Sequence, residues 1–341
     1  MKVAIYGAGA MGTVLGALLT KSGVTVDLIT RNRAHADQLK KQGATVICTA
    51  ENKVLQTPVS ALTPEEMTEK YDVVFLMTKQ RENVEIATFL KDKLAKNGIV
   101  CTTQNGLPEY KLCEILGKDK VFGGVCTFGA NFLGEGKTEL TSRFSGMRLC
   151  VGGVNGTDGV KILTDVLQGV SNVIGNPNFL STTDNLLGIR WNKLCINAAF
   201  STLSVITGLP FGKIARKRGS ARVAVGMLRE CFAVMNAAGI EQEKMQGHDL
   251  QKLFGGCGFL QTQKALFLLP FAIRKHKLLV SGMLKDIEKG RKCEIDYIAG
   301  AVVEIGKRYG VQTPILEQAV EIVHGIENGL YEITAKNLAF F

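Results

Sequence analysis

The chain has 341 residues, 46% of them hydrophobic and 21% charged, which is the composition of a globular protein that is too long for one ordinary core. Its net charge is +10, but no aromatic platform or nucleic-acid-binding motif accompanies the basic clusters at 213–218 and 274–277, so a nucleic-acid partner is not expected. The longest uncharged apolar run, Ala265–Ile273, is far shorter than the roughly 20 residues that a membrane-spanning helix needs.

The cysteines and the N-terminus both predict a cytoplasmic protein. The nine cysteines are scattered through apolar segments, and no two of them form a C-x-x-C pair. This pattern favours reduced thiols over a disulfide framework or a metal site, so no metal is expected. The opening residues, MKVAIYGAGAMG, are typical of a strand and a turn rather than of a signal peptide.

The first half of the chain alternates between strand and helix patterns. Apolar runs that predict strands occupy 2–7, 24–30, 71–78 and 98–104, and helical spacing follows the first two of them at 8–23 and 31–43. Such βαβ alternation predicts a doubly wound, Rossmann-like parallel sheet covered by helices. The glycine-rich runs at 121–142 and 146–156 predict shorter strands that continue the same sheet as an antiparallel edge.

The hydrophobic period changes after residue 185, and from Leu186 onward it is helical for most of the chain. The stretch Gly175–Asn185 contains an Asn-Pro-Asn turn and then residues that are frequent at helix N-termini. We therefore predict two domains, a dinucleotide-binding domain at 1–180 and an all-helical domain at 181–341 that carries the substrate site. A helical domain of this length would also permit a homodimer.

A glycine motif follows the first predicted strand. Gly7, Gly9 and Gly12 form G-x-G-x-x-G between that strand and a helix, which is the context that makes the motif specific for a dinucleotide. Gly7 would allow a tight turn, Gly9 the approach of a pyrophosphate, and Gly12 close packing of the helix on the strand. Ala10 and Met11 would supply backbone N–H groups at the helix N-terminus.

The end of the second predicted strand indicates which dinucleotide is bound. NAD sites usually carry an acidic residue there, whereas this chain has Thr30-Arg31-Asn32-Arg33, and Asp27 lies in mid-strand. A guanidinium suits a 2′-phosphate, so Arg31 favours NADPH over NADH. Arg33 has the alternative of being a solvated residue at the start of a helix.

Polar residues also follow the next two strands, where ligands of open α/β sheets bind. Lys79 comes after the strand at 71–78, and Asn105 comes after the strand at 98–104. Either could be an ordinary loop residue or part of a site.

The helical segment 190–204, RWNKLCINAAFSTLS, carries three polar residues at a spacing of four. Lys193, Asn197 and Ser201 would share one face of an otherwise apolar helix. A structural explanation is an ion pair between the lysine and Glu294, Asp184 or Asp296, because an unpartnered buried ammonium is costly. A functional explanation is a pocket beside a nicotinamide, where an ammonium stabilises and protonates the alkoxide formed by hydride transfer.

These motifs, in this order, resemble the ketopantoate reductase family (2-dehydropantoate 2-reductase). The matching segments are GAGAMG, the strand-end TK and QNG, RWNKLCIN and CEIDYIAG, which together cover nearly the whole chain. The resemblance implies a Rossmann domain followed by a helical domain. It also implies NADPH-dependent reduction of a 2-oxo acid to an (R)-2-hydroxy acid, which in that family is a step of pantothenate biosynthesis.

The resemblance also implies roles for individual residues. Lys193 matches the general acid, Glu294 matches a glutamate that binds the substrate hydroxyl and helps to place the lysine, and Asn197 matches a substrate contact. Asn105 matches an asparagine near nicotinamide and substrate, and Lys79 matches a lysine on the cofactor side.

The cofactor arginine of the family matches Arg31, which would read the 2′-phosphate. The chain departs from the family pattern at Ser201 and Ala299, where asparagines are usual, and at Gly282, where a serine usually helps to hold the substrate. The neighbouring Ser281 could replace that serine in a shifted register. These departures leave open a D-2-hydroxyacid dehydrogenase that acts on branched or aromatic 2-oxo acids. A third hypothesis is an NADPH-binding sensor without turnover.

Overall fold

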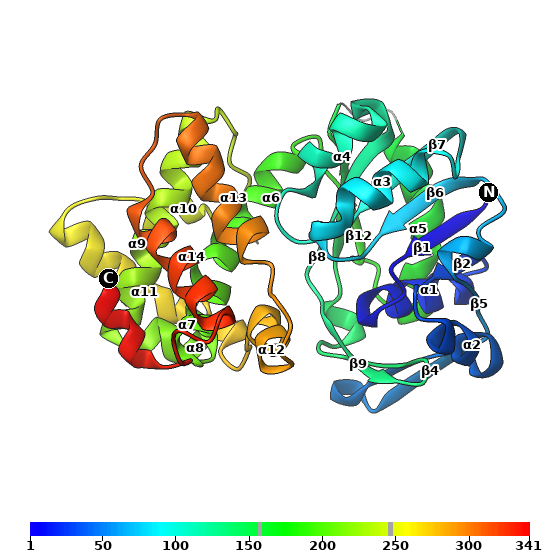
Figure 1. Ribbon diagram of the computed structural model, residues 1–341, viewed down its shortest axis with the longest axis horizontal. Coiled ribbons are helices and arrows are strands. Elements are labelled where there is room, and N and C mark those ends of the chain that lie inside the picture. The colour runs from blue at the N-terminus through cyan, green and yellow to red at the C-terminus, as the bar shows by residue number, and fades with distance from the viewer. Residues whose placement is uncertain (156–158, 245–247) are drawn as a thin grey trace. The chain divides into compact units, whose positions relative to one another are not determined.

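The computed structural model describes residues 1–155, 159–244 and 248–341, and these fold into two compact units (Figure 1). Unit 1 comprises Met1–Gln104 and Pro108–Leu186, and unit 2 comprises Asn105–Leu107 and Leu187–Phe341. The α/β and all-α classes that the hydrophobic periods predict for the two parts of the chain are both confirmed. No helix among the described residues has the length and the apolar character that crossing a bilayer requires.

Unit 1 is built on an eight-stranded sheet of order β12-β11-β8-β7-β6-β1-β2-β5. The strands are β1 (Val3–Tyr6), β2 (Val26–Ile29), β5 (Ser60–Leu62), β6 (Tyr71–Leu76), β7 (Leu94–Thr102), β8 (Val121–Cys126), β11 (Leu149–Gly153) and β12 (Leu180–Thr182). Neighbouring strands are parallel except for β11, which runs antiparallel to β8 as the sequence predicts for this edge.

Helices cover both faces of this sheet, because the strands are apolar on both sides. Val3 and Ile5 of β1 belong to a core with α1 (Ala10–Lys21) and α5 (Val160–Ile174). Ala4 and Tyr6, which point to the opposite face, belong to a core with α3 (Asn83–Lys91) and α4 (Pro108–Leu116). This is the doubly wound arrangement that buries near-continuous apolar strands.

One strand assignment from the sequence is wrong. Within 121–142 only β8 joins the main sheet, whereas β9 (Ala130–Gly134) and β10 (Lys137–Leu140) pair in a separate four-stranded sheet with β3 (Ala44–Cys48) and β4 (Lys53–Thr57). The reason is that β7 and β11 already pair with the two sides of β8, so the hairpin that follows β8 cannot pair next to that strand.

Unit 2 is helical and has one continuous core. Its helices are α6 (Leu186–Ile196), α7 (Thr202–Thr207), α8 (Phe211–Arg216), α9 (Arg218–Ala237), α10 (Leu250–Phe254), α11 (Phe259–Ala272), α12 (Gly282–Glu288), α13 (Ile295–Arg308) and α14 (Pro314–Glu327). The twenty-residue α9 packs against α8, α11, α13 and α14, and Trp191 of α6 donates from Nε1 to the carbonyl of Cys231 on α9 at 3.0 Å. The nine cysteines carry free thiols, as predicted, and Cys257 is exposed.

Candidate functional site

The glycine motif forms a turn whose three glycines have different surroundings. Gly7 has a φ of +108°, and a Cβ there would lie 2.8 Å from the backbone of Met77 and Thr78. A Cβ on Gly12 would collide with the carbonyl oxygen of Gly7, whereas a Cβ on Gly9 would have no atom within 4 Å. The motif therefore combines two glycines required by packing with one that keeps the space beyond the α1 N-terminus open. This geometry fits the backbone cradle of a dinucleotide pyrophosphate, with Ala10 and Met11 in the first turn of the helix.

A histidine that belongs to none of the sequence motifs, His35, forms a hydrogen bond with the backbone of this turn. His35 lies on the buried face of α2 (Arg33–Gln42), with Nε2 2.9 Å from the carbonyl oxygen of Ala8 and its ring edge-on to Phe132. Burial lowers the pKa of His35, so the ring is neutral at pH 7 and Nε2 donates the hydrogen bond. Only the tertiary structure brings this side chain to the loop, because nothing in the helical period of 31–43 distinguishes it.

The structure decides the role of the acidic residue in β2. Asp27 is buried within the strand, accepts a hydrogen bond from the Tyr71 hydroxyl at 2.9 Å and lies 3.6 Å from the Lys2 ammonium. Burial and the bond to Asp27 raise the pKa of Tyr71. Asp27 thus serves the sheet and does not lie at the strand tip, where a ribose-binding carboxylate would be needed.

Arg31 follows the tip of β2 and extends into solvent. Its side chain is 66% exposed, and Nη2 lies 2.9 Å from Oε1 of Glu82 in the turn before α3. An exposed ion pair of this kind contributes only about 0–1 kcal/mol, so Arg31 can exchange this carboxylate for another anion at little cost.

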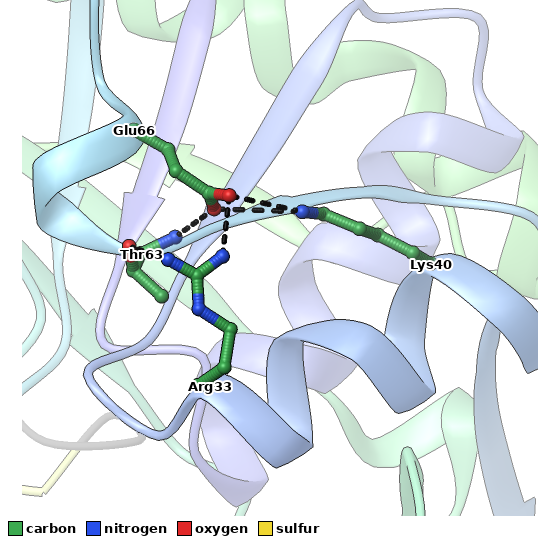
Figure 2. Close-up of polar contacts among 4 residues, drawn as sticks. All are labelled: Arg33, Lys40, Thr63 and Glu66. Carbon is green, nitrogen blue, oxygen red and sulfur yellow. Dashed lines mark hydrogen bonds and ion pairs between the residues drawn. The ribbon is translucent and has the colours of Figure 1, made fainter.

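Arg33, in contrast, belongs to a structural cluster (Figure 2). Its guanidinium pairs with the Glu66 carboxylate and donates to the Thr63 hydroxyl at 3.3 Å. The same carboxylate accepts from the Thr63 backbone N–H at 2.8 Å and lies 3.4 Å from Lys40. The Thr63 N–H and the Arg33 guanidinium lower the pKa of Glu66 to about 2. Arg33 is therefore tied to both Glu66 and Thr63, which makes Arg31 the better candidate for a ligand.

This cluster predicts a pH dependence of stability. A carboxylate whose pKa is lowered on folding stabilises the protein above its ordinary pKa, near 4.5, and this contribution is lost as the pH falls toward 2. We expect Glu66→Gln to be less stable than the wild type at pH 7 and the difference to shrink between pH 4.5 and 3. Urea denaturation at several pH values measures this, and a difference that is constant over the range would contradict it.

Lys79 and Asn105 follow the carboxyl ends of β6 and β7, as the sequence predicts. Both side chains are exposed, and Gly106 has a φ of +79°. The residue before Asn105 organises this edge: the Gln104 amide is buried, donates to the Thr78 carbonyl at 2.9 Å and exchanges hydrogen bonds with the Asn83 amide at 2.7 and 3.1 Å. This link between the loops that follow the two strands was not predicted from the sequence. Its only signal was the amide pair in QNG.

The polar row of unit 2 lies on one partly exposed face. Lys193, Asn197 and Ser201 are half-buried, and the residues between them are buried apart from Ile196. The Ser201 hydroxyl lies 3.5 Å from Oδ1 of Asn197. The predicted helix is present, but Asn197–Ser201 forms a π-helical turn between α6 and α7. Such turns widen a helix locally and are frequent at functional sites.

Glu294 is half-buried and immediately precedes α13. Asp296, one of the carboxylates considered for Lys193, instead lies 2.8 Å from Nε2 of His324. Ala299 is fully buried in the core of unit 2, so the replacement of the family asparagine by alanine changes the packing of this core.

Ser281 is 2% exposed and caps α12, because its hydroxyl oxygen accepts from the Met283 backbone N–H at 3.1 Å. This favours a structural role for Ser281. The neighbouring Gly282 borders open space.

Comparison with known proteins agrees with this arrangement. The model of "Ketopantoate reductase PanE/ApbA" matches residues 3–148, and that of "Ketopantoate reductase PanE/ApbA C terminal" matches residues 185–327. The chain belongs to the ketopantoate reductase family. Its relatives in this family are oxidoreductases. The 2-dehydropantoate 2-reductase of Archaeoglobus fulgidus is 27% identical over 96% of this chain and 99% of its own length, and that of Pyrococcus horikoshii is 26% identical over 92% and 94%.

Solved structures of ketopantoate reductases have the same fold. A PanE/ApbA family ketopantoate reductase from Ralstonia eutropha is 26% identical, with a TM-score of 0.79 over 97% of this chain and 99% of its own. A D-mandelate dehydrogenase, solved with NADH and anilino(oxo)acetate, is 23% identical, with a TM-score of 0.80 over 97% and 99%. At 23% identity, the similarity to D-mandelate dehydrogenase shows a common fold and no more.

Proposed function

We propose that this protein is an NADPH-dependent reductase that converts 2-dehydropantoate to pantoate, an (R)-2-hydroxy acid. The observation that carries the proposal is the pairing of two features in one chain of this family. Unit 1 has a glycine turn with open space at Gly9, and unit 2 has Lys193, Asn197 and Ser201 on a partly exposed face. The bound dinucleotide would supply the hydride.

The residues of unit 2 have distinct tasks in this proposal. The Lys193 ammonium stabilises the negative charge that develops on the substrate carbonyl oxygen, and it then donates a proton to that oxygen. Asn197 and Asn105 orient the substrate, and Glu294 binds the hydroxyl group of 2-dehydropantoate. Ser281 is left outside the site because its hydroxyl caps α12.

The residues of unit 1 hold the cofactor. The backbone of Gly7, Gly9, Ala10 and Met11 receives the pyrophosphate beside Gly12. Lys79 contributes a positive charge at the end of β6. Arg31 binds the 2′-phosphate in place of the Glu82 carboxylate.

Cofactor preference gives a testable prediction. We expect Arg31→Ala to weaken NADPH binding about tenfold or more, the scale of a lost charge-assisted contact, and to change NADH binding by less than about twofold. Arg81→Ala is the matched control, because Arg81 is exposed and also lies 3.6 Å from Glu82. Fluorescence titration with both cofactors decides, and an equal loss for NADPH and NADH would exclude a 2′-phosphate role for Arg31.

The substrate is tested with a panel of 2-oxo acids, assayed with NADPH and with NADH. We expect kcat/KM to be highest for 2-dehydropantoate with NADPH. A value no better than that for branched or aromatic 2-oxo acids would favour the second candidate, a broader D-2-hydroxyacid dehydrogenase. Ser201 is the observation behind that candidate, since a residue smaller than asparagine on the half-buried face leaves room for a bulkier substrate. If the protein binds NADPH but oxidises it with none of the 2-oxo acids in the panel, it would be an NADPH-binding sensor without turnover.

A further inference from the structure

A chain of polar contacts joins the end of α14 to the start of α13, next to Glu294. Glu327, the last residue of α14, accepts a hydrogen bond from the backbone N–H of Cys293 at 2.7 Å through Oε1. Its Oε2 lies 3.3 Å from Nδ1 of His324, and Nε2 of His324 lies 2.8 Å from Oδ1 of Asp296. These polar contacts therefore involve residues on both sides of Glu294 in the sequence, namely Cys293 and Asp296.

Glu327 occupies a position that is unfavourable for a carboxylate. Its side chain is only 4% exposed, and it lies at the C-terminus of its own helix, where the helix dipole repels an anion. The Cys293 N–H, the His324 imidazole and the nearby N-terminus of α13 compensate for this. Burial and a hydrogen bond to Glu327 raise the pKa of the Cys293 thiol, so the thiol remains protonated and can donate to the same carboxylate.

The cluster is a hydrogen-bonded chain and not a metal site. Among the residues that the structure describes, no group of three or more His, Cys, Asp or Glu side chains is arranged to hold a metal ion. Unit 2 contains a second glutamate carboxylate that accepts hydrogen bonds from backbone N–H groups at the start of a helix. Glu230 of α9 accepts from the backbone N–H groups of Ile315 and Leu316, each at 2.9 Å, and so caps the start of α14. That cap lies at the opposite end of α14 from Glu327.

We propose that Glu327 is a positioning residue for Glu294. It fixes the backbone that leads into Glu294, and His324 fixes Glu327 by bridging it to Asp296 in the first turn of α13. A displacement of about 1 Å at a substrate contact can reduce the rate about 10²-fold, so a clamp on the preceding peptide has consequences for catalysis. The inference rests on the proposed function, which assigns Glu294 to the substrate.

Steady-state kinetics of Glu327→Ala, Glu327→Gln and Glu230→Ala test the proposal with 2-dehydropantoate and NADPH. We expect Glu327→Ala to lower kcat/KM for the 2-oxo acid about tenfold or more and to leave the KM for NADPH within about twofold. Glu327→Gln retains an acceptor for the Cys293 N–H and should recover most of the loss. Glu230→Ala removes a comparable cap and should lower Tm with little change in kcat/KM. Equal kinetics for the two alanine variants would overturn the proposal.

Hydrogen exchange at the Cys293 amide provides a measurement that needs no substrate. We expect exchange to be at least about tenfold faster in Glu327→Ala than in the wild type and in Glu230→Ala, because the amide loses its acceptor. Unchanged exchange would overturn the inference even for a protein that reduces no 2-oxo acid. A wild type that reduces none, with the exchange altered as expected, would refute the proposed function and leave the backbone clamp supported.

Discussion

Lys193→Ala is expected to lower kcat for reduction of the 2-oxo acid by about 10²-fold or more, the usual scale for the loss of a general acid. NADPH binding should change little, because the residues that we assign to the cofactor lie in unit 1, apart from Asn105. Steady-state kinetics and fluorescence titration of the same preparation measure the two quantities. If turnover is nearly unchanged, another group is the acid.

A second substitution separates the two tasks of the lysine. Lys193→Arg retains a positive charge, but the guanidinium does not release its proton in this pH range. We expect the arginine variant to bind the 2-oxo acid more tightly than the alanine variant and to remain slow in turnover. Full activity of Lys193→Arg would mean that the residue contributes charge and not a proton.

Gly9→Ala is expected to impair NADPH binding, whereas Gly12→Ala is expected to lower the stability of the fold. A Cβ on Gly9 meets no atom of the protein, so the free energy of unfolding should stay within about 1 kcal/mol of the wild type. The same methyl group lies where the proposed pyrophosphate would approach, and we expect NADPH to bind about tenfold or more weakly. A Cβ on Gly12 collides with the Gly7 carbonyl oxygen, which should cost about 3 kcal/mol of stability.

Urea denaturation and NADPH titration of the two glycine variants provide the measurements. If Gly9→Ala binds NADPH as tightly as the wild type, the pyrophosphate does not bind next to Gly9. Wild-type stability in Gly12→Ala would mean that the turn can shift to accept a side chain. The pair therefore distinguishes a residue required for folding from one required for the cofactor.

The sequence was sufficient where a feature depends on local spacing. The glycine motif was found because its three positions are fixed along the chain by one turn and one helix. The parallel sheet was predicted from apolar runs that alternate with helical segments, and the helical second part from a hydrophobic period of 3.6 residues. The row of Lys193, Asn197 and Ser201 followed from the same helical spacing.

Partners distant in the chain could not be predicted in this way. The pairing of β9 and β10 with β3 depends on which strand edges remain free after the main sheet has formed. Glu66 engages Arg33, and Asp27 engages Tyr71, through contacts more than 30 residues apart. The sequence favours Arg31 over Arg33 for the 2′-phosphate, and the contacts of Arg33 with Glu66 and Thr63 show what Arg33 does instead.

The fold class, the glycine cradle and the residue types of the proposed chemistry can be predicted from the sequence, because each depends on spacing between residues close together in the chain. The tertiary structure decided which of these side chains are available. It engaged Arg33 and Ser281 in structural contacts, and it placed a π-helical turn within the polar row. It also brought His35 to the glycine turn and Glu327 to the peptide before Glu294. The reason is physical: hydrogen bonds and ion pairs depend on the distance between atoms in the folded chain.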